Sequence, residues 1–470
     1  MTQPHRPFRP TLAGMSTRRR FAGSAAALPL ALGAVHTASA QATPGASPIA
    51  TPVEGGTSHP FLMITDREEP TLWFYSIPDG RLTGKLDNLL MASHGSAFQL
   101  PDGRLIVGRL GDQALDIAGQ SIDALVVDEQ GVPSVVASVP ATFGESAAWI
   151  AVDPNLTTLV FGSLREGEAV PQVLNIVDLA TFTNTQLEFE MNEPEEITTW
   201  LVGDPLHLHV SVGGRIDSYE LAELLNGNTT PLGSVEVDLG SHGGATDADR
   251  DRLFYVTAPG QGMDVLDVSN GVAEYVTQIP WDMDGRTGGY NARPSVSRDG
   301  DHIFGVLIGD AEDPTQWADL ACDLHVVNMA DLTAIRTPIG TGAFTTRWAM
   351  GGKVALAAGY NADGGTAYVI DADVESATFA SVIQEIPVNV PTNGQVPGAW
   401  DDDAEMYYVC ALTPDDAYGF VTIPGDSLVQ VLDLAAGEVI QEITTETDLS
   451  GFGYSKVVQA GILPVDLWGR

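Results

Sequence analysis

Four side chains of the kinds that bind metals stand at the same place in a recurring pattern of this chain. His94, Glu145 and Glu196 each lie eight residues before an aspartate, and His242 lies seven residues before one. The aspartates that mark the pattern are Asp102, Asp153, Asp204 and Asp249. Imidazole and carboxylate groups are ligands that zinc accepts, and such ligands need not be close in sequence. If the fold brings the four positions together, the sequence predicts a site for a divalent cation, with zinc as the candidate.

The same four positions also have a structural interpretation. Polar side chains around a channel often bind ordered water or neighbouring strands instead of a metal. Both histidines stand in a Ser-His-Gly sequence, whose glycine would let the backbone come close to a shared axis. Further along the chain, the equivalent positions hold residues less suited to metal: Asn291, Arg347 and Trp348.

Other candidate ligands carry weaker patterns. His207 and His209 are two residues apart, so they share one face of an expected strand. One interpretation is that the pair binds a metal. The favoured interpretation is that both side chains are packed and hydrogen-bonded within the fold. Residues 282–285 read Asp-Met-Asp-Gly, like the opening of a calcium loop, but the closing acid is missing, which favours a surface turn. His302 and His325 have no motif around them.

Familiar catalytic motifs are absent from the sequence. It contains no Gly-x-Ser-x-Gly elbow, no phosphate-binding loop after a strand and no Cys-x-x-Cys-His haem attachment. Hydrolase, dehydrogenase and haem functions therefore have no support from local motifs. Whether the protein is an enzyme stays open, with a non-enzymatic role favoured.

A repeated strand pattern must position these residues. A tight Asp/Gly turn followed by an apolar strand recurs at 97–108, 149–162, 246–256, 296–306 and 412–422. Partner strands that close on aspartate recur at 125–128, 175–178, 265–267, 368–371 and 431–433. The turns are spaced by about 50 residues, which is a propeller period. Propellers direct the segments before these turns toward a central channel, where distant side chains meet.

The fold class predicted is all-β: a single β-propeller of seven or eight four-stranded blades, with eight favoured. The first unit, at 61–90, lacks one strand, and the apolar segment 454–463 could supply it. The N-terminal and C-terminal strands would then close the ring and remove an exposed sheet edge. One short helix is expected at 218–225, as a loop insertion.

The composition excludes some partners. The formal net charge is −40, with 62 acidic against 22 basic residues. Nucleic acid and anionic membrane surfaces are poor partners for such a field. The acids are spread along every repeat, which favours a solvated acidic shell, with a cation-attracting surface as the functional alternative. No segment has the roughly 20 apolar residues needed to span a bilayer.

The N-terminus predicts export. Residues 17–21 read Thr-Arg-Arg-Arg-Phe and precede an alanine-rich apolar run and a small-residue cleavage site at Ala40. We expect a twin-arginine signal at 1–40, a flexible linker at 41–59 and the propeller at 60–470, in a periplasmic or extracellular protein. In such a compartment Cys322 and Cys410 could form one disulfide, with two buried free thiols as the alternative.

The segment 412–443 resembles the repeat of YVTN-type bacterial propellers. In that repeat a Pro-Asp turn, an aromatic-Val strand and a Val-x-Val-Asp strand follow in order; here they correspond to Pro-Asp at 414–415, Phe-Val at 420–421 and Val-Gln-Val-Leu-Asp at 429–433. The exported single-propeller layout, the segment 209–225 and the following His-Gly at His242 are similar to AztD-like periplasmic zinc metallochaperones. That resemblance implies zinc as the ligand and the solute-binding component of an ABC importer as the partner.

Three functions remain open from the sequence. The first is an exported binding protein that holds zinc at His94, Glu145, Glu196 and His242 and presents it to another protein. The second is a propeller enzyme of the lactonase or quinoprotein-like type. The third is a protein-interaction scaffold with no metal.

Overall fold

The computed structural model describes most of the chain after residue 56. The described residues are 57–66, 69–92, 96–111, 119–144, 146–164, 171–189, 198–212, 214–237, 244–256, 262–287, 294–308, 318–344, 347–391, 408–449 and 453–461. The predicted signal at 1–40 and most of the predicted linker at 41–59 lie outside them.

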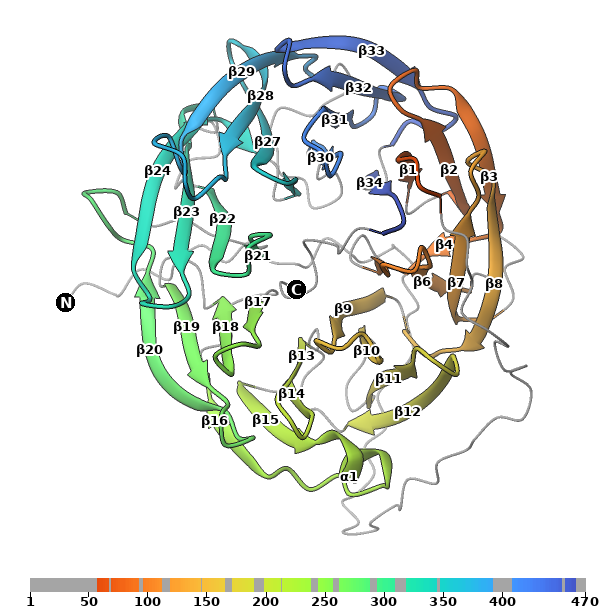
Figure 1. Ribbon diagram of the computed structural model, residues 1–470, viewed down its shortest axis with the longest axis vertical. Coiled ribbons are helices and arrows are strands. Elements are labelled where there is room, and N and C mark those ends of the chain that lie inside the picture. The colour runs from red at the N-terminus through yellow and green to blue at the C-terminus, as the bar shows by residue number, and fades with distance from the viewer. Residues whose placement is uncertain are drawn as a thin grey trace, which may run out of the picture.

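Eight antiparallel sheets surround a central axis, and each is one blade of a propeller (Figure 1). The prediction of an all-β propeller with eight blades is confirmed. Blades are numbered here in chain order. The innermost strand of blade 1 is the C-terminal strand β34 (Tyr454–Val458), and in every other blade it is the strand that comes first in the chain (Figure 1). In blades 2 and 7 this innermost strand is split into two short pieces that both pair with the second strand.

The strands of the first four blades have the following bounds. Blade 1 contains β34 (Tyr454–Val458), β1 (Phe61–Thr65), β2 (Thr71–Ser76) and β3 (Leu82–Asp87). Blade 2 contains β4 (Leu90–Met91), β5 (Ala97–Gln99), β6 (Leu105–Leu110), β7 (Ser121–Val127) and β8 (Pro133–Pro140). Blade 3 contains β9 (Ser146–Val152), β10 (Thr158–Leu164), β11 (Gln172–Asp178) and β12 (Thr183–Phe189). Blade 4 contains β13 (Thr199–Val202), β14 (His207–Val212), β15 (Arg215–Glu220), α1 (Leu221–Leu225) and β16 (Gly233–Glu236).

The other four blades continue the same plan. Blade 5 contains β17 (Gly244–Asp247), β18 (Arg252–Val256), β19 (Gly262–Asp267) and β20 (Glu274–Pro280). Blade 6 contains β21 (Ser295–Val296), β22 (His302–Ile308), β23 (Ala321–Asn328) and β24 (Ala334–Thr341). Blade 7 contains β25 (Ala343–Phe344), β26 (Ala349–Met350), β27 (Val354–Asn361), β28 (Gly364–Asp371) and β29 (Val382–Val388). Blade 8 contains β30 (Val409–Leu412), β31 (Tyr418–Ile423), β32 (Leu428–Asp433) and β33 (Glu438–Thr444).

The C-terminal strand closes the ring, as predicted. β34 pairs antiparallel with β1, with Phe61 opposite Val458 and Thr65 opposite Tyr454. The ends are also tied to each other and to blade 2, because the Ala460 N–H donates to the Thr57 carbonyl and the Thr57 N–H donates to the Val127 carbonyl.

The recurring aspartates have a local reason. Asp153 accepts the N–H groups of Asn155, Thr157 and Thr158, at 3.0, 2.6 and 2.5 Å, so its carboxylate holds the turn between β9 and β10. The aspartate that ends a third strand does the same: Asp433 accepts two N–H groups of the turn before β33. An Asx side chain that mimics a turn hydrogen bond explains why the pattern repeats.

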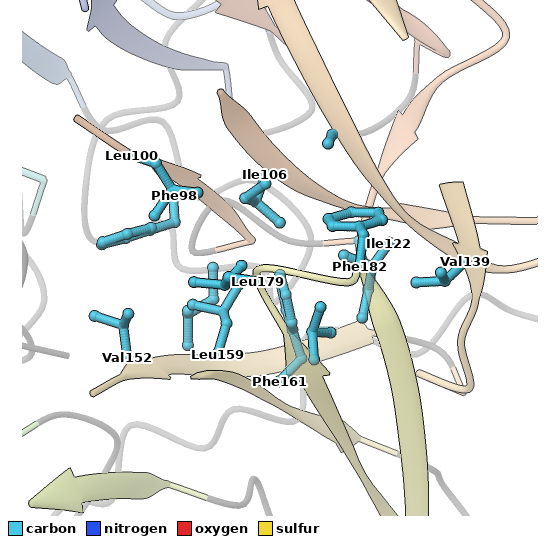
Figure 2. Close-up of a cluster of buried hydrophobic side chains, with 14 of the residues drawn as sticks. Phe98, Leu100, Ile106, Ile122, Val139, Val152, Leu159, Phe161, Leu179 and Phe182 are labelled. Carbon is cyan, nitrogen blue, oxygen red and sulfur yellow. The ribbon is translucent and has the colours of Figure 1, made fainter. Parts of the chain in front are cut away.

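The apolar core lies between neighbouring blades. Figure 2 shows the cluster between blades 2 and 3, where Phe98, Ile106 and Ile122 face Leu159 and Phe161. Because each blade packs both faces against its neighbours, its two central strands are mostly buried, and this includes polar side chains as well as apolar ones. The strand β7, for example, is buried along its whole length.

The predicted helix is shorter than expected. Helix α1 covers only Leu221–Leu225, whereas residues 218–220 belong to β15. Ser218 lies opposite both His209 of β14 and Gly233 of β16, so sheet pairing on both sides overrides the local helical pattern. No helix among the described residues has the length and apolar character to cross a membrane.

Candidate functional site

The four predicted ligands, His94, Glu145, Glu196 and His242, all lie outside the described residues. The strands that follow them in sequence are described: β5, β9, β13 and β17. These are innermost strands of blades 2, 3, 4 and 5. Strand β13 contacts both β9 and β17, so three of the four strands lie side by side at the axis. Each of the four positions therefore stands in sequence shortly before an innermost strand, and the convergence of their side chains stays a prediction.

The beginning of β17 is closely packed against blade 4. A Cβ atom on Gly244 would lie 2.7 Å from Nε1 of Trp200 and 2.6 Å from the Phe254 carbonyl oxygen. Trp200 itself is buried on β13. Only glycine fits this approach of backbone to indole, two residues after His242.

The beginning of β13 is likewise fixed by hydrogen bonds to the second strand of its blade. The Thr198 N–H donates to the Ser211 hydroxyl at 3.2 Å, and the Ser211 N–H donates to the Thr198 carbonyl at 2.9 Å. Thr198 follows Glu196 by two residues and is buried. The residues that begin β13 and β17, which follow Glu196 and His242 in sequence, are thus fixed by contacts with blade 4.

On the other side of the ring the equivalent positions hold different chemistry. Arg347 and Trp348 are both buried, whereas Asn291 lies outside the described residues. The Arg347 carbonyl accepts the Cys410 N–H at 2.9 Å, which ties blade 7 to blade 8. The Trp348 ring packs against Phe304 at a centroid distance of 6.5 Å.

His207 and His209 share one face of β14, as predicted, with ring centroids 6.4 Å apart. Nδ1 of His209 lies 2.9 Å from the Ser218 hydroxyl, which also accepts the Ala273 N–H from blade 5. Burial, together with the smaller effect of the neighbouring His207, lowers the pKa of His209 to about 3. Among the described residues no three His, Cys, Asp or Glu side chains form a metal-binding group. The geometry of this pair fits packed histidines.

His325 and His302 also serve packing. His325 is buried, with its ring at 5.0 Å and 89° to Trp281, and burial lowers its pKa to about 4, with the Arg336 charge as a further cause. His302 packs edge-on against Phe379, and its Nδ1 is 3.6 Å from an Asp299 carboxylate oxygen.

The Asp-Met-Asp-Gly sequence at 282–285 forms a turn. Met283 and Arg286 exchange backbone hydrogen bonds of 3.1 and 2.9 Å across it. The turn presents Arg286, whose guanidinium donates to the buried Asp323 of blade 6 at 2.6 Å. Asp323 also accepts the Nε–H of Arg336 at 2.7 Å, so one carboxylate joins blades 5 and 6.

The disulfide expected between Cys322 and Cys410 is not formed. Both cysteines are free and buried. Cys322 lies on β23 of blade 6 and Cys410 on β30 of blade 8, with the whole of blade 7 between them. A disulfide requires Cα atoms within about 7 Å, which this arrangement does not provide. Burial also raises the pKa of the Cys410 thiol, which keeps it protonated.

Comparison with known proteins supports the fold and leaves the activity open. No family model matches the chain, and no curated protein matches its sequence. Two structures of AztD from Citrobacter koseri, one described as apo, are similar to it with TM-scores of 0.57 and 0.55; each shares 13% identity and covers 86% of this chain and 99% of its own. The dihydro-heme d1 dehydrogenase NirN in complex with DHE is similar with a TM-score of 0.52 and 13% identity, over 91% of this chain and 80% of its own. What the chain shares with these proteins is the eight-bladed propeller fold.

Proposed function

We propose that this protein is an exported binding protein that holds zinc at the mouth of its channel and presents it to another protein. The proposed ligands are His94, Glu145, Glu196 and His242. The observation that carries the proposal is their common position: each precedes the innermost strand of one of four consecutive blades. The AztD-like fold and the sequence resemblance to zinc metallochaperones support the same ligand.

The chemistry of the set suits a metal that must be released again. Two neutral imidazoles and two carboxylates balance the charge of Zn²⁺, and they bind it less tightly than thiolates do. Both cysteines are buried and away from the axis strands β5, β9, β13 and β17, so they would not compete. The net charge of −40 also raises the local concentration of cations around the protein.

A transfer role requires a protein partner. By resemblance, that partner is the solute-binding component of a metal importer, in the periplasmic or extracellular space. A propeller suits this role because its mouth can be shared between two proteins while its blades stay rigid.

The test is zinc content after purification of residues 41–470 without chelators. We expect one zinc per chain by elemental analysis, and loss of that zinc when His94→Ala is combined with His242→Ala. The matched control combines His59→Ala with His207→Ala, which removes two imidazoles that lie outside the proposed ring. Unchanged zinc in the first variant, or zinc loss in the control, would refute the proposed site.

The two other functions are outcomes of the same experiment. A zinc-loaded protein that hydrolyses lactones would be an enzyme, and the transfer role would be wrong. If the protein takes up no zinc even at excess metal, the remaining function is that of a protein-interaction scaffold without a metal.

A further inference from the structure

The turn between β26 and β27 of blade 7 is closed by a carboxylate from another blade. In the corresponding turn of blade 3, Asp153 accepts the N–H groups of its own turn, but blade 7 has Gly-Gly-Lys at 351–353 and no aspartate there. Asp416 of blade 8 replaces it. Its Oδ1 accepts the Gly352 N–H and its Oδ2 accepts the Lys353 N–H, both at 2.6 Å. One carboxylate thus binds two successive backbone N–H groups of the neighbouring blade.

Two glycines make room for this carboxylate. A Cβ atom on Gly351 would collide with Oδ1 of Asp416, and a Cβ atom on Gly352 would lie 2.9 Å from its Oδ2. The Gly351 N–H donates to the Val354 carbonyl at 2.8 Å, so the turn is closed and its other N–H groups are held in fixed directions. Successive backbone N–H groups that point to one side form a concave site for anions. We call residues 351–354 the anion cradle.

An arginine from a third blade adds positive charge beside the anion cradle. Arg298 lies in the turn between β21 and β22 of blade 6, and its guanidinium donates to the Pro414 carbonyl of blade 8 at 3.1 Å. A Cβ atom on Gly352 would lie 3.1 Å from Nη1 of Arg298. Burial raises the pKa of Asp416, and the backbone N–H groups together with the Arg298 charge oppose that shift. Backbone dipoles and a guanidinium therefore favour an anion here, in a chain whose net charge is −40.

The backbone at Asp416 suits glycine better than aspartate. Asp416 has a φ of 61°, and its N–H donates to the Thr413 carbonyl at 3.0 Å. The corresponding residues in the turns of blades 2 and 6 are Gly103 and Gly300, with φ values of 90° and 77°. Residues with a side chain adopt this region less easily than glycine does. The carboxylate contact explains an aspartate at this position, and a glycine there would remove the carboxylate without straining the turn.

We propose that the anion cradle, with Arg298 beside it, is a carboxylate-binding site that blade 8 fills with Asp416, and that this contact holds blades 7 and 8 together. In the folded protein the attached carboxylate excludes free anions, because an intramolecular ligand has a high effective concentration. Removing Asp416 should therefore leave a site that binds a free carboxylate. This inference does not depend on the proposed zinc site.

The experiment measures the thermal midpoint of unfolding of the full-length chain during titration with sodium formate, with sodium chloride keeping the ionic strength constant. The variants are Asp416→Gly, Asp416→Gly combined with Arg298→Gln, and the control Asp415→Ala. Asp415 is exposed, and its carboxylate accepts the Ala417 N–H of its own turn at 3.1 Å. The control therefore removes a neighbouring carboxylate and leaves the anion cradle filled.

In chloride, we expect the midpoint of Asp416→Gly to lie about 2 °C or more below that of wild type, because two charge-assisted hydrogen bonds are lost. Formate should raise this midpoint along a saturable curve. Wild type and Asp415→Ala should show no saturable rise. Adding Arg298→Gln should weaken the apparent formate affinity of the Asp416→Gly variant by about 3-fold to 5-fold, as for an exposed charge pair.

Three results would overturn the proposal: Asp416→Gly as stable as wild type in chloride, no formate response in Asp416→Gly, or the same formate response in wild type, which would show a general effect of the salt. An unchanged formate affinity in the combined variant would exclude Arg298 from the site. Hydrogen exchange decides the question if Asp416→Gly does not fold. Asp416→Asn keeps the turn and one acceptor oxygen, so peptides covering 351–354 should exchange faster than in wild type, and equal exchange would contradict the proposal.

Discussion

Two buried histidines predict that this propeller loses stability in mild acid. His209 and His325 are almost fully buried, and burial lowers their pKa values to about 3 and about 4. Nε2 of each ring has no hydrogen-bond partner among the described residues, so a proton added there would be a buried charge without compensation. Both side chains therefore stay neutral in the folded protein at pH values where the unfolded chain is protonated.

The size of the effect follows from proton linkage. An unfolded histidine has a pKa near 6.5, so the unfolded state binds more protons below that pH, and the free energy of unfolding falls as the pH falls. The stabilisation is complete above pH 6.5 and is lost between 6.5 and the folded pKa. At pH 5 each histidine has lowered the free energy of unfolding by about 2 kcal/mol, because each pH unit below 6.5 lowers it by about 1.4 kcal/mol. The two together should lower the free energy of unfolding by about 4 kcal/mol between pH 7 and pH 5.

The assay is denaturant unfolding at pH 7, 6 and 5 for wild type, His209→Gln, His325→Gln and the double variant. Each single variant is expected to be less stable at pH 7, yet to lose about 2 kcal/mol less than wild type on going to pH 5. His59→Gln is the control, because this side chain is 74% exposed. Asp247 and Asp416 have pKa values raised by burial, an effect of the opposite sign, but they are present in every variant and cancel in the comparison. If the double variant and wild type lost the same free energy, burial of neutral imidazoles would not be the cause of acid lability.

Two further predictions concern how the ring is held together. Asp323→Asn removes the carboxylate that binds both Arg336, which is buried, and Arg286, so the free energy of unfolding should fall by about 3–5 kcal/mol. The control Asp331→Asn changes an exposed turn and should leave the thermal midpoint of unfolding unchanged. Equal midpoints for the two variants would contradict the role of Asp323. Ending the chain at residue 453 removes β34 and exposes the edge of β1, so we expect aggregation or loss of cooperative unfolding in size-exclusion and calorimetry measurements. Ending it at residue 461 keeps β34 and should preserve both properties, and a fully cooperative monomer without β34 would show that closure is dispensable.

Much of the fold could be predicted because its signals are local. Each Asx turn, such as that of Asp153, is made by a side chain and N–H groups within five residues, so it leaves a pattern that repeats with every blade. The closing strand was predictable because the segment 454–463 is largely apolar and the first blade lacked a strand. The error at α1 arose because the pairing of Ser218 with two strands depends on residues that are distant in sequence.

The candidate site was predictable only as a set of positions. The repeat places His94, Glu145, Glu196 and His242 before the innermost strands, but no motif marks the contacts between blades, such as Gln120 accepting the Phe143 N–H and Asn175 donating to the Thr142 carbonyl. The backbone groups that these amides hold lie 23 and 33 residues away in sequence, across the boundary between two blades. A sequence signal for them would require knowing which blades touch.

The amino-acid sequence by itself determined the all-β class, the blade period, the closure of the ring and the acidic character, since these follow from short-range turn chemistry and from composition. The tertiary structure alone decided that Cys322 and Cys410 are kept apart by a whole blade, that His325 is buried against Trp281, and that the amides of Gln120 and Asn175 hold the chain between blades 2 and 3. The physical reason is the same in each case. Burial and contact between blades depend on how the sheets pack around the axis, and that packing joins residues whose separation in sequence carries no local signal.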